Sequence, residues 1–148
     1  ENWAIKTHFD SKFPEANFKE DYYRFSKILI GVGDAKGADQ SIGLKHELIA
    51  LKNPYIMSSS DEFSVQLLFN GQPQKNKKIT IFERKTDKTV SVRTAFTDSN
   101  GISKFTVTQG NEYLIDNVIL ELNNKPKNDT FWTSYWAALT FRASNEPQ

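Results

Sequence analysis

The run Asp61–Pro73, DEFSVQLLFNGQP, carries the clearest evidence for the fold class of this chain. Four large apolar residues fall on every second position, and these are Phe63, Val65, Leu67 and Phe69. A β-strand places such residues on one face, whereas a helix would scatter them around its circumference. The Asn70-Gly71 pair that follows tolerates positive φ at both positions, which is typical of a tight hairpin. The stretch therefore predicts a half-buried strand that leads into a β-hairpin.

Strand patterns recur along the chain, over residues 24–33, 45–52, 77–85, 89–96, 101–107, 112–122 and 134–141. Turn signals such as Asn53-Pro54 and Asn100-Gly101 separate them at intervals of about 8–12 residues. In the run 89–96, the residues that share one face are Val90, Val92, Thr94 and Phe96. This spacing is typical of a β-sandwich or a β-barrel. The length of 148 residues is sufficient for one domain with its own core.

The run SYWAALTF, Ser134–Phe141, predicts the closing strand of that core. One face carries Tyr135, Ala137, Leu139 and Phe141, which is a core face by alternation. Trp136 projects to the opposite side, where it either covers a second layer or meets a ligand. Trp132 lies in what we expect to be a preceding loop, which makes it the better candidate for exposure. The alternative to the core is therefore an aromatic platform of Trp132, Tyr135 and Trp136.

The first 22 residues combine aromatic and charged side chains without a clean period. We expect an irregular arm over residues 1–22, a sandwich over 23–143 and a frayed tail over 144–148. Within the arm, Pro14 is suited to open a short helix from Ala16 to Tyr22. Because the chain begins at Glu1 rather than Met, we also expect that a signal peptide has been removed.

The composition excludes several classes of function. Lys and Arg total 19 and Asp and Glu total 18, which gives a formal net charge of +1. This balance provides no electrostatic argument for binding nucleic acid. The absence of cysteine excludes disulfides, thiolate zinc sites and a thiol nucleophile. The sequence has no apolar run long enough to span a membrane.

The two histidines are the obvious candidates for chemistry. His46 lies in a predicted strand and is expected to be structural. His8, near Asp10 in the arm, is either a surface residue or part of a weak metal site that needs carboxylates to complete it. The sequence shows no paired-histidine metal spacing and no base–nucleophile pair, so we expect no enzymatic activity and no certain cofactor.

The run TDSNGIS, Thr97–Ser103, resembles the front of a calcium loop. Counting from Asp98, the twelfth position should supply a bidentate Glu, but it is Gln109. The run therefore predicts a hairpin turn.

Four segments in succession carry a more specific signal, namely Gly43–Tyr55, Asp61–Phe82, Thr97–Phe105 and Trp132–Phe141. Their order resembles the bacterial DUF4198 family over about residues 22–143, and members of that family are often described as periplasmic proteins associated with nickel or cobalt uptake. The resemblance implies an immunoglobulin-like or prealbumin-like β-sandwich of about seven to nine strands. It also implies export to the periplasm and a non-enzymatic role.

Two functions therefore stand open. The preferred one is a periplasmic binding or accessory domain for nickel or cobalt uptake, with His8 and Asp10 as metal ligands and Ni²⁺ or Co²⁺ as the metal. Its partner would be a membrane component of metal uptake or a small ligand, and not nucleic acid. The alternative is a carbohydrate- or peptide-recognition domain that uses Trp132, Tyr135 and Trp136 as a stacking surface.

Overall fold

The computed structural model describes residues 6–8, 10, 19–58, 61–127 and 130–144. Among these residues only 6–8 and 10 are helical, and β-strands predominate. The described strands are β1 (Lys19–Ile28), β2 (His46–Ala50), β3 (Glu62–Phe69), β4 (Gln72–Pro73), β5 (Lys78–Arg84), β6 (Val90–Phe96), β7 (Ile102–Thr106), β8 (Glu112–Lys127) and β9 (Thr130–Arg142). The predicted all-β fold is confirmed.

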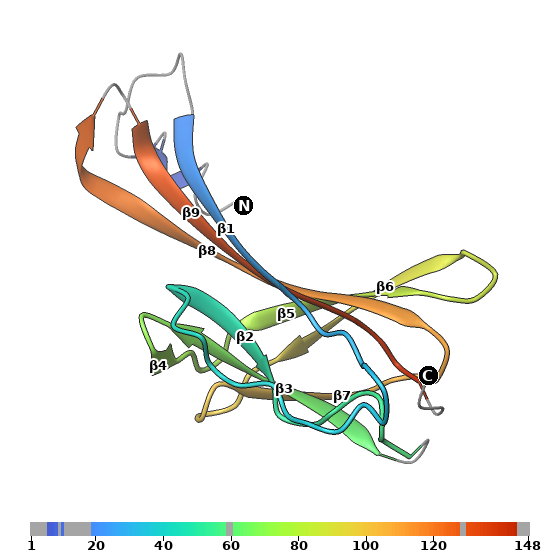
Figure 1. Ribbon diagram of the computed structural model, residues 1–148. Helices are drawn as coiled ribbons and strands as arrows, with labels where there is room; N and C mark the ends of the chain where they lie inside the picture. The colour runs from blue at the N-terminus through green and yellow to red at the C-terminus, as the bar shows by residue number, and fades with distance from the viewer. Residues whose placement is uncertain (1–5, 9, 11–18, 59–60, 128–129, 145–148) are drawn as a thin grey trace. The chain divides into compact units, whose positions relative to one another are not determined.

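The strands form two sheets (Figure 1). One has the order β1-β9-β8-β5-β6, and the other has the order β2-β3-β4 with β7 also paired to β3. The stretch DEFSVQLLFNGQP supplies β3, the tight turn and β4, with Phe69 opposite Gln72. Asn70 and Gly71 have φ values of 51° and 73°, as the predicted hairpin requires. The chain is therefore an all-β sandwich of nine described strands.

The chain divides into two compact units. Unit 1 comprises residues 1–24 and 118–136, and unit 2 comprises residues 25–117 and 137–148. The hydrophobic core of unit 2 draws on both sheets, since Phe63 of β3 lies 4.5 Å from Phe141 of β9 between ring centroids. The predicted core face of the closing strand is confirmed, because Tyr135, Ala137, Leu139 and Phe141 are all buried.

Two local predictions need correction. Residues 19–22 begin strand β1, so the short helix expected up to Tyr22 is wrong there, and residues 16–18 lie outside the described part. The β-prone aromatic pair Tyr22-Tyr23 outweighs any helical preference in this segment. The turn after β6 forms as predicted, with the Asp98 carboxylate accepting from Asn100 and Ile102 N–H groups. It is not a hairpin, however, because β6 pairs with β5 and β7 pairs with β3.

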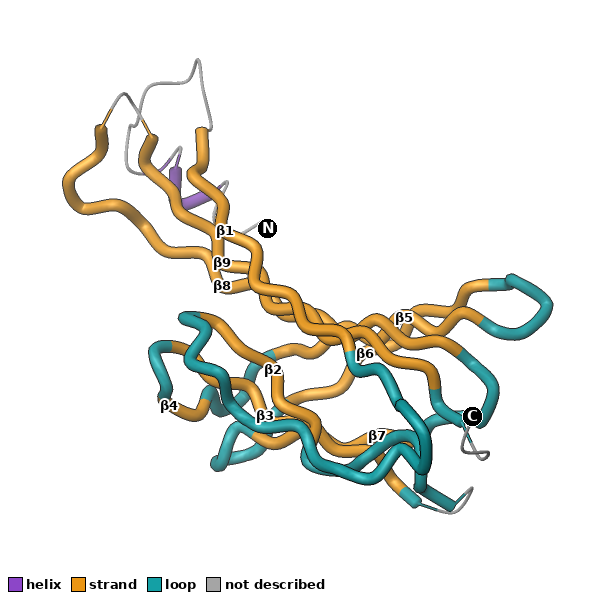
Figure 2. Tube along the Cα trace, viewed as in Figure 1, coloured by secondary structure: helices purple, strands orange, loops and turns teal. Residues whose placement is uncertain are grey.

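The segment between β1 and β2 is a long loop that follows the smaller sheet (Figure 2). The Asn53-Pro54-Tyr55 run holds it in place. The Asn53 side-chain amide donates to the carbonyls of Ala35 and Gly37, at 2.7 and 3.1 Å. The Tyr55 hydroxyl donates to the Leu29 carbonyl at 2.6 Å. These hydrogen bonds give the Asn53-Pro54-Tyr55 run a structural use, because they satisfy carbonyls of the loop.

Candidate functional site

The first predicted metal ligand, His8, lies inside unit 1 with no exposed surface. The Nε1–H of Trp132 donates to its Nδ1 at 3.1 Å, and the Phe131 ring meets the imidazole edge-on at 5.9 Å between centroids. An Nδ1 that accepts a hydrogen bond carries no proton, so this atom holds its lone pair toward the indole. A metal at Nδ1 would have to displace Trp132.

The second predicted metal ligand, Asp10, is exposed and forms an ion pair with Lys6, four positions earlier. Residues 6–8 and 10 are helical, but the carboxylate has Lys6 as its partner rather than His8. In the part of the chain that the structure describes, no three His, Asp or Glu side chains come together to hold a metal. The assignment of a metal to His8 and Asp10 stays a prediction.

Trp132 does not lie in an exposed loop, so that expectation is wrong. It belongs to β9, and its side chain has no exposed surface. Strand β9 begins before Trp132, and Nδ1 of His8 accepts a hydrogen bond from the buried indole N–H. Tyr135 is also buried, and its ring stacks on Tyr23 at 5.6 Å with an interplanar angle of 14°. Of the three predicted stacking residues, Trp136 retains the most exposure.

Trp136 instead belongs to an outward-facing group that we call the aromatic surface, made of Tyr22, Arg24 and Trp136. The guanidinium carbon of Arg24 lies 5.6 Å from the Tyr22 ring centroid and 5.4 Å from that of Trp136. Tyr22 is 63% exposed. The Trp136 Nε1–H donates to the Ser134 hydroxyl at 3.0 Å, which orients the indole. A cation that lies within about 6 Å of two aromatic rings is attracted by both quadrupoles, so the three side chains form one layer.

Tyr22 was missed because we expected its segment to be arm or helix, and Arg24 was missed because it was treated only as part of a predicted strand over residues 24–33. The signal that could have found them is the two-residue period of the segment, in which Tyr22 and Arg24 alternate with Tyr23 and Phe25. β1 lies beside β9 in the sheet, which brings residues 22 and 24 to the side of Trp136. Residues that are far apart in sequence thereby share one surface.

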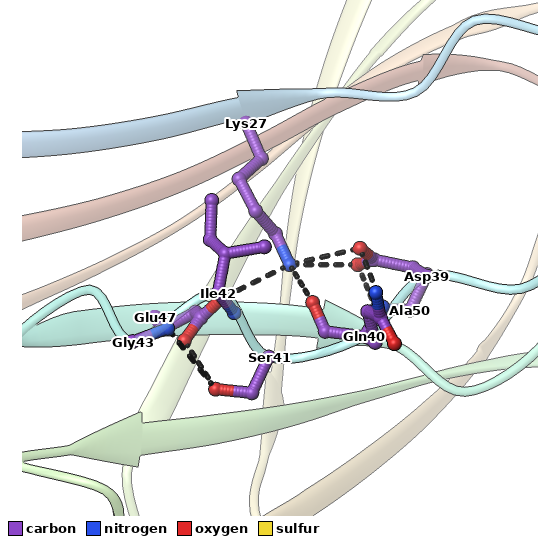
Figure 3. A network of polar contacts seen from close by, with 8 residues as sticks. All are labelled: Lys27, Asp39, Gln40, Ser41, Ile42, Gly43, Glu47 and Ala50. Carbon is purple, nitrogen blue, oxygen red and sulfur yellow. Dashed lines mark hydrogen bonds and ion pairs between the residues drawn. The ribbon is translucent and has the colours of Figure 1, made fainter.

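A buried charge network forms in unit 2 around Lys27 (Figure 3). The ammonium contacts both carboxylate oxygens of Asp39 at 2.9 and 3.0 Å, the Gln40 carbonyl at 3.2 Å and the Glu47 carboxylate at 3.3 Å. The side chains of Lys27, Asp39 and Glu47 are 9%, 10% and 1% exposed. Charges this well covered must be paired, and the network pairs them.

The Glu47 carboxylate is ionised in this network. Burial alone would raise its pKa, but the Ile42 N–H, the Ser41 hydroxyl and the Lys27 charge outweigh burial and hold the pKa below its ordinary value. The two hydrogen bonds measure 2.9 and 2.7 Å (Figure 3). Asp39 also accepts the Ala50 N–H at 2.9 Å. Because the partners are loop backbone and neighbouring side chains, the network fastens the loop to β1 and β2 rather than presenting a reactive group.

Unit 2 also has an open pocket of about 410 Å³. Its apolar lining includes Ile28, Ile30 and Tyr55, and an ion pair between Arg84 and Glu112 borders it. The hydrogen bond from Arg84 lowers the pKa of the Glu112 carboxyl. The pocket can accept an apolar group. The Arg84 guanidinium and the Glu112 carboxylate already pair with each other, so they are poorly placed to bind the polar groups of a ligand.

Within the described residues, no helix combines the length and the hydropathy that crossing a membrane requires. Neither a curated protein nor a solved structure matches this chain. A family model does match, over residues 3–119, and its description is a domain of unknown function. Since that match covers most of the sequence, the chain belongs to the DUF4198 family.

Proposed function

We propose that this chain is a non-enzymatic binding domain that recognises an extended peptide segment through the aromatic surface. The observation that carries the proposal is the Arg24 guanidinium, which lies over both the Tyr22 ring and the Trp136 ring. Trp, Tyr and Arg are the residues most enriched among those that dominate the energy of protein interfaces. Here all three occur in one ordered, outward-facing layer.

Because the three side chains already hold one another in place, they are well suited to bind a ligand tightly. A side chain that is already held in place loses little conformational entropy when a ligand arrives. The Ser134 hydroxyl fixes the Trp136 indole, and Arg24 spans the two rings. The guanidinium can donate in its own plane to a carboxylate or to backbone carbonyls of the ligand.

The location of β1 supports a peptide rather than a compact ligand. β1 is the first strand in the order of the larger sheet, so among the described strands only β9 lies beside it. An extended peptide can add to such an edge through its backbone while its side chains contact the aromatic surface.

The test is a peptide-library selection against the folded chain, followed by calorimetric titration of the selected peptide. Trp136→Ala and Arg24→Ala should each lower the affinity about tenfold or more, because both remove a side chain of the proposed contact. Ile56→Ala, which truncates an exposed side chain of unit 2, is the matched control and should bind normally. Equal binding by all three variants would refute the site. Binding of a glycan and of no peptide would refute the ligand class.

The second proposal is the one that the family resemblance implies, a periplasmic or otherwise exported accessory domain for nickel or cobalt uptake. Membership of the DUF4198 family favours it. His8 and Asp10 would supply the metal ligands, and a membrane component of metal uptake or a small ligand would be the partner. Its calorimetric test is described with the predictions in the Discussion, and fractionation of the source cells tests the location.

A further inference from the structure

We propose that the chain forms a homodimer in which β6 pairs antiparallel with β6 of a second copy. The proposal concerns unit 2 and is independent of the aromatic surface. β6 is the last strand in the order of the larger sheet, at the end opposite β1. Among the described strands, only β5 pairs with it.

The backbone of β6 presents a row of donors and acceptors on its outer side. Just beyond the two ends of the strand, the Thr97 N–H donates to Lys77 and the Lys85 N–H donates to Thr89. In an antiparallel pair, hydrogen-bonded positions recur at every second residue, so the odd-numbered residues of β6 bond to β5. The N–H and C=O groups of Val90, Val92, Thr94 and Phe96 therefore point away from β5.

The side chains at the same positions form an apolar row. Val90, Val92 and Phe96 are 60%, 58% and 61% exposed. The shared face that the sequence predicts is thus confirmed, but it faces outward. The apolar row extends over the same face of the sheet to the neighbouring strands β5 and β8, because Val92 lies opposite Phe82 and Phe82 lies opposite Leu114. Isolated exposed apolar residues are ordinary, whereas a contiguous exposed band marks an interaction surface.

The exposed face of β6 carries none of the charges that often protect a sheet edge from pairing, and the strand contains no Pro. Its single charged residue, Arg93, lies on the other face of the strand. The guanidinium donates to the Thr106 hydroxyl at 3.2 Å and to the Thr106 carbonyl, and its carbon lies 5.7 Å from the Phe105 ring centroid. Arg93 is therefore engaged by β7, and its charge does not lie on the exposed apolar face of β6.

A second copy fits this edge because β6 is complementary to itself. Antiparallel pairing centred on Thr94 places Val92 opposite Phe96 of the second copy. The same register places Arg93 opposite Ala95, so no like charges meet. Cross-strand pairs of an aromatic with a β-branched side chain are among the stabilising ones. A centre at Arg93 would instead oppose two guanidinium groups, which is unfavourable.

The absence of cysteine from the chain allows a clean crosslinking test. In the proposed register, the two Thr94 Cα atoms would lie about 5.5 Å apart, which is within the range of a disulfide. Thr94→Cys should therefore form an intermolecular disulfide under mild oxidation. Leu114→Cys is the matched control, since it lies on the same sheet face but two strands away from the edge, and should stay unlinked.

Sedimentation measurements complete the test. The wild-type chain should show a monomer–dimer equilibrium, and Val92→Lys should shift it to monomer while circular dichroism shows an unchanged fold. Crosslinking of Leu114→Cys in place of Thr94→Cys would mean face-to-face packing and would overturn the proposal. Equal crosslinking of both variants, which random collision produces, would overturn the proposal, and so would a wild-type chain that stays monomeric throughout a dilution series.

Discussion

The indole Nε1–H of Trp132 donates a 3.1 Å hydrogen bond to Nδ1 of His8, although 124 positions separate the two residues in the sequence. Neither side chain has exposed surface. The bond joins His8, near the start of the chain, to β9 within unit 1. It gives an N-terminal histidine a structural role that its neighbours in the sequence do not reveal.

His8→Ala should lower the free energy of unfolding by about 1–3 kcal/mol, because it leaves the buried Trp132 N–H without its acceptor. Asp10→Ala should cost less than about 1 kcal/mol, since its ion pair with Lys6 is exposed. Urea denaturation followed by tryptophan fluorescence measures both. Equal effects of the two substitutions would show that the hydrogen bond contributes little.

The metal-uptake proposal predicts stoichiometric binding of Ni²⁺ or Co²⁺ that His8→Ala abolishes and Asp10→Ala weakens. Coordination at Nδ1 would displace the Trp132 indole, so tryptophan fluorescence should change in step with binding. Calorimetric titration of the chelator-stripped chain measures the affinity. Absence of binding by either metal would end this proposal. Loss of binding in His46→Ala but not in His8→Ala would move the site to β2.

Lys27→Met should destabilise the chain by about 3–5 kcal/mol, because it leaves the buried carboxylates of Asp39 and Glu47 without their cation. Lys36→Met provides the matched control. Lys36 also pairs with a carboxylate, that of Asp34, but the two side chains are 81% and 64% exposed. The control should therefore cost less than about 1 kcal/mol. Similar losses in the two variants would contradict the network's role.

The network should also make the stability depend on pH in the acid range. The pKa of Glu47 is lower in the folded chain than in the unfolded chain, so the unfolded chain binds more protons between the two values. The resulting stability is present above the ordinary Glu pKa of about 4.3 and is lost as the pH falls through the folded value. Glu47→Gln cannot be protonated and should show a shallower decline in urea denaturation between about pH 3 and 7. A decline as steep as that of the wild-type chain would assign the acid sensitivity to other carboxyls, such as Glu83.

Local patterns in the sequence predicted those parts of the fold that depend on neighbouring residues. The Asn70-Gly71 turn and the buried face of β9 follow from backbone preference and period, and both are confirmed. The burial of Trp132 could not be predicted in this way, since it depends on His8 at the other end of the chain.

The exposure of Val90, Val92 and Phe96 could not be predicted for a similar reason. Alternation shows which residues share a face, but it does not show which face meets the core. The Tyr22–Arg24–Trp136 layer depends on β1 lying beside β9, a pairing that the sequence does not encode locally. Of the three residues of the aromatic surface, only Trp136 was therefore predicted as a site residue.

Gly101→Ala should destabilise the chain more than Gly71→Ala, although the two glycines have nearly equal φ values of 72° and 73°. A Cβ at residue 101 would lie 2.9 Å from both the Gln74 nitrogen and the Leu67 carbonyl oxygen, which are backbone atoms that cannot rotate away. A Cβ at residue 71 would meet no atom within 4 Å. Both substitutions carry the strain of positive φ, about 1–2 kcal/mol, so the difference between them isolates the steric clash. Thermal denaturation of the two variants measures that difference, and equal losses would mean that the turn between β6 and β7 can shift away from β3.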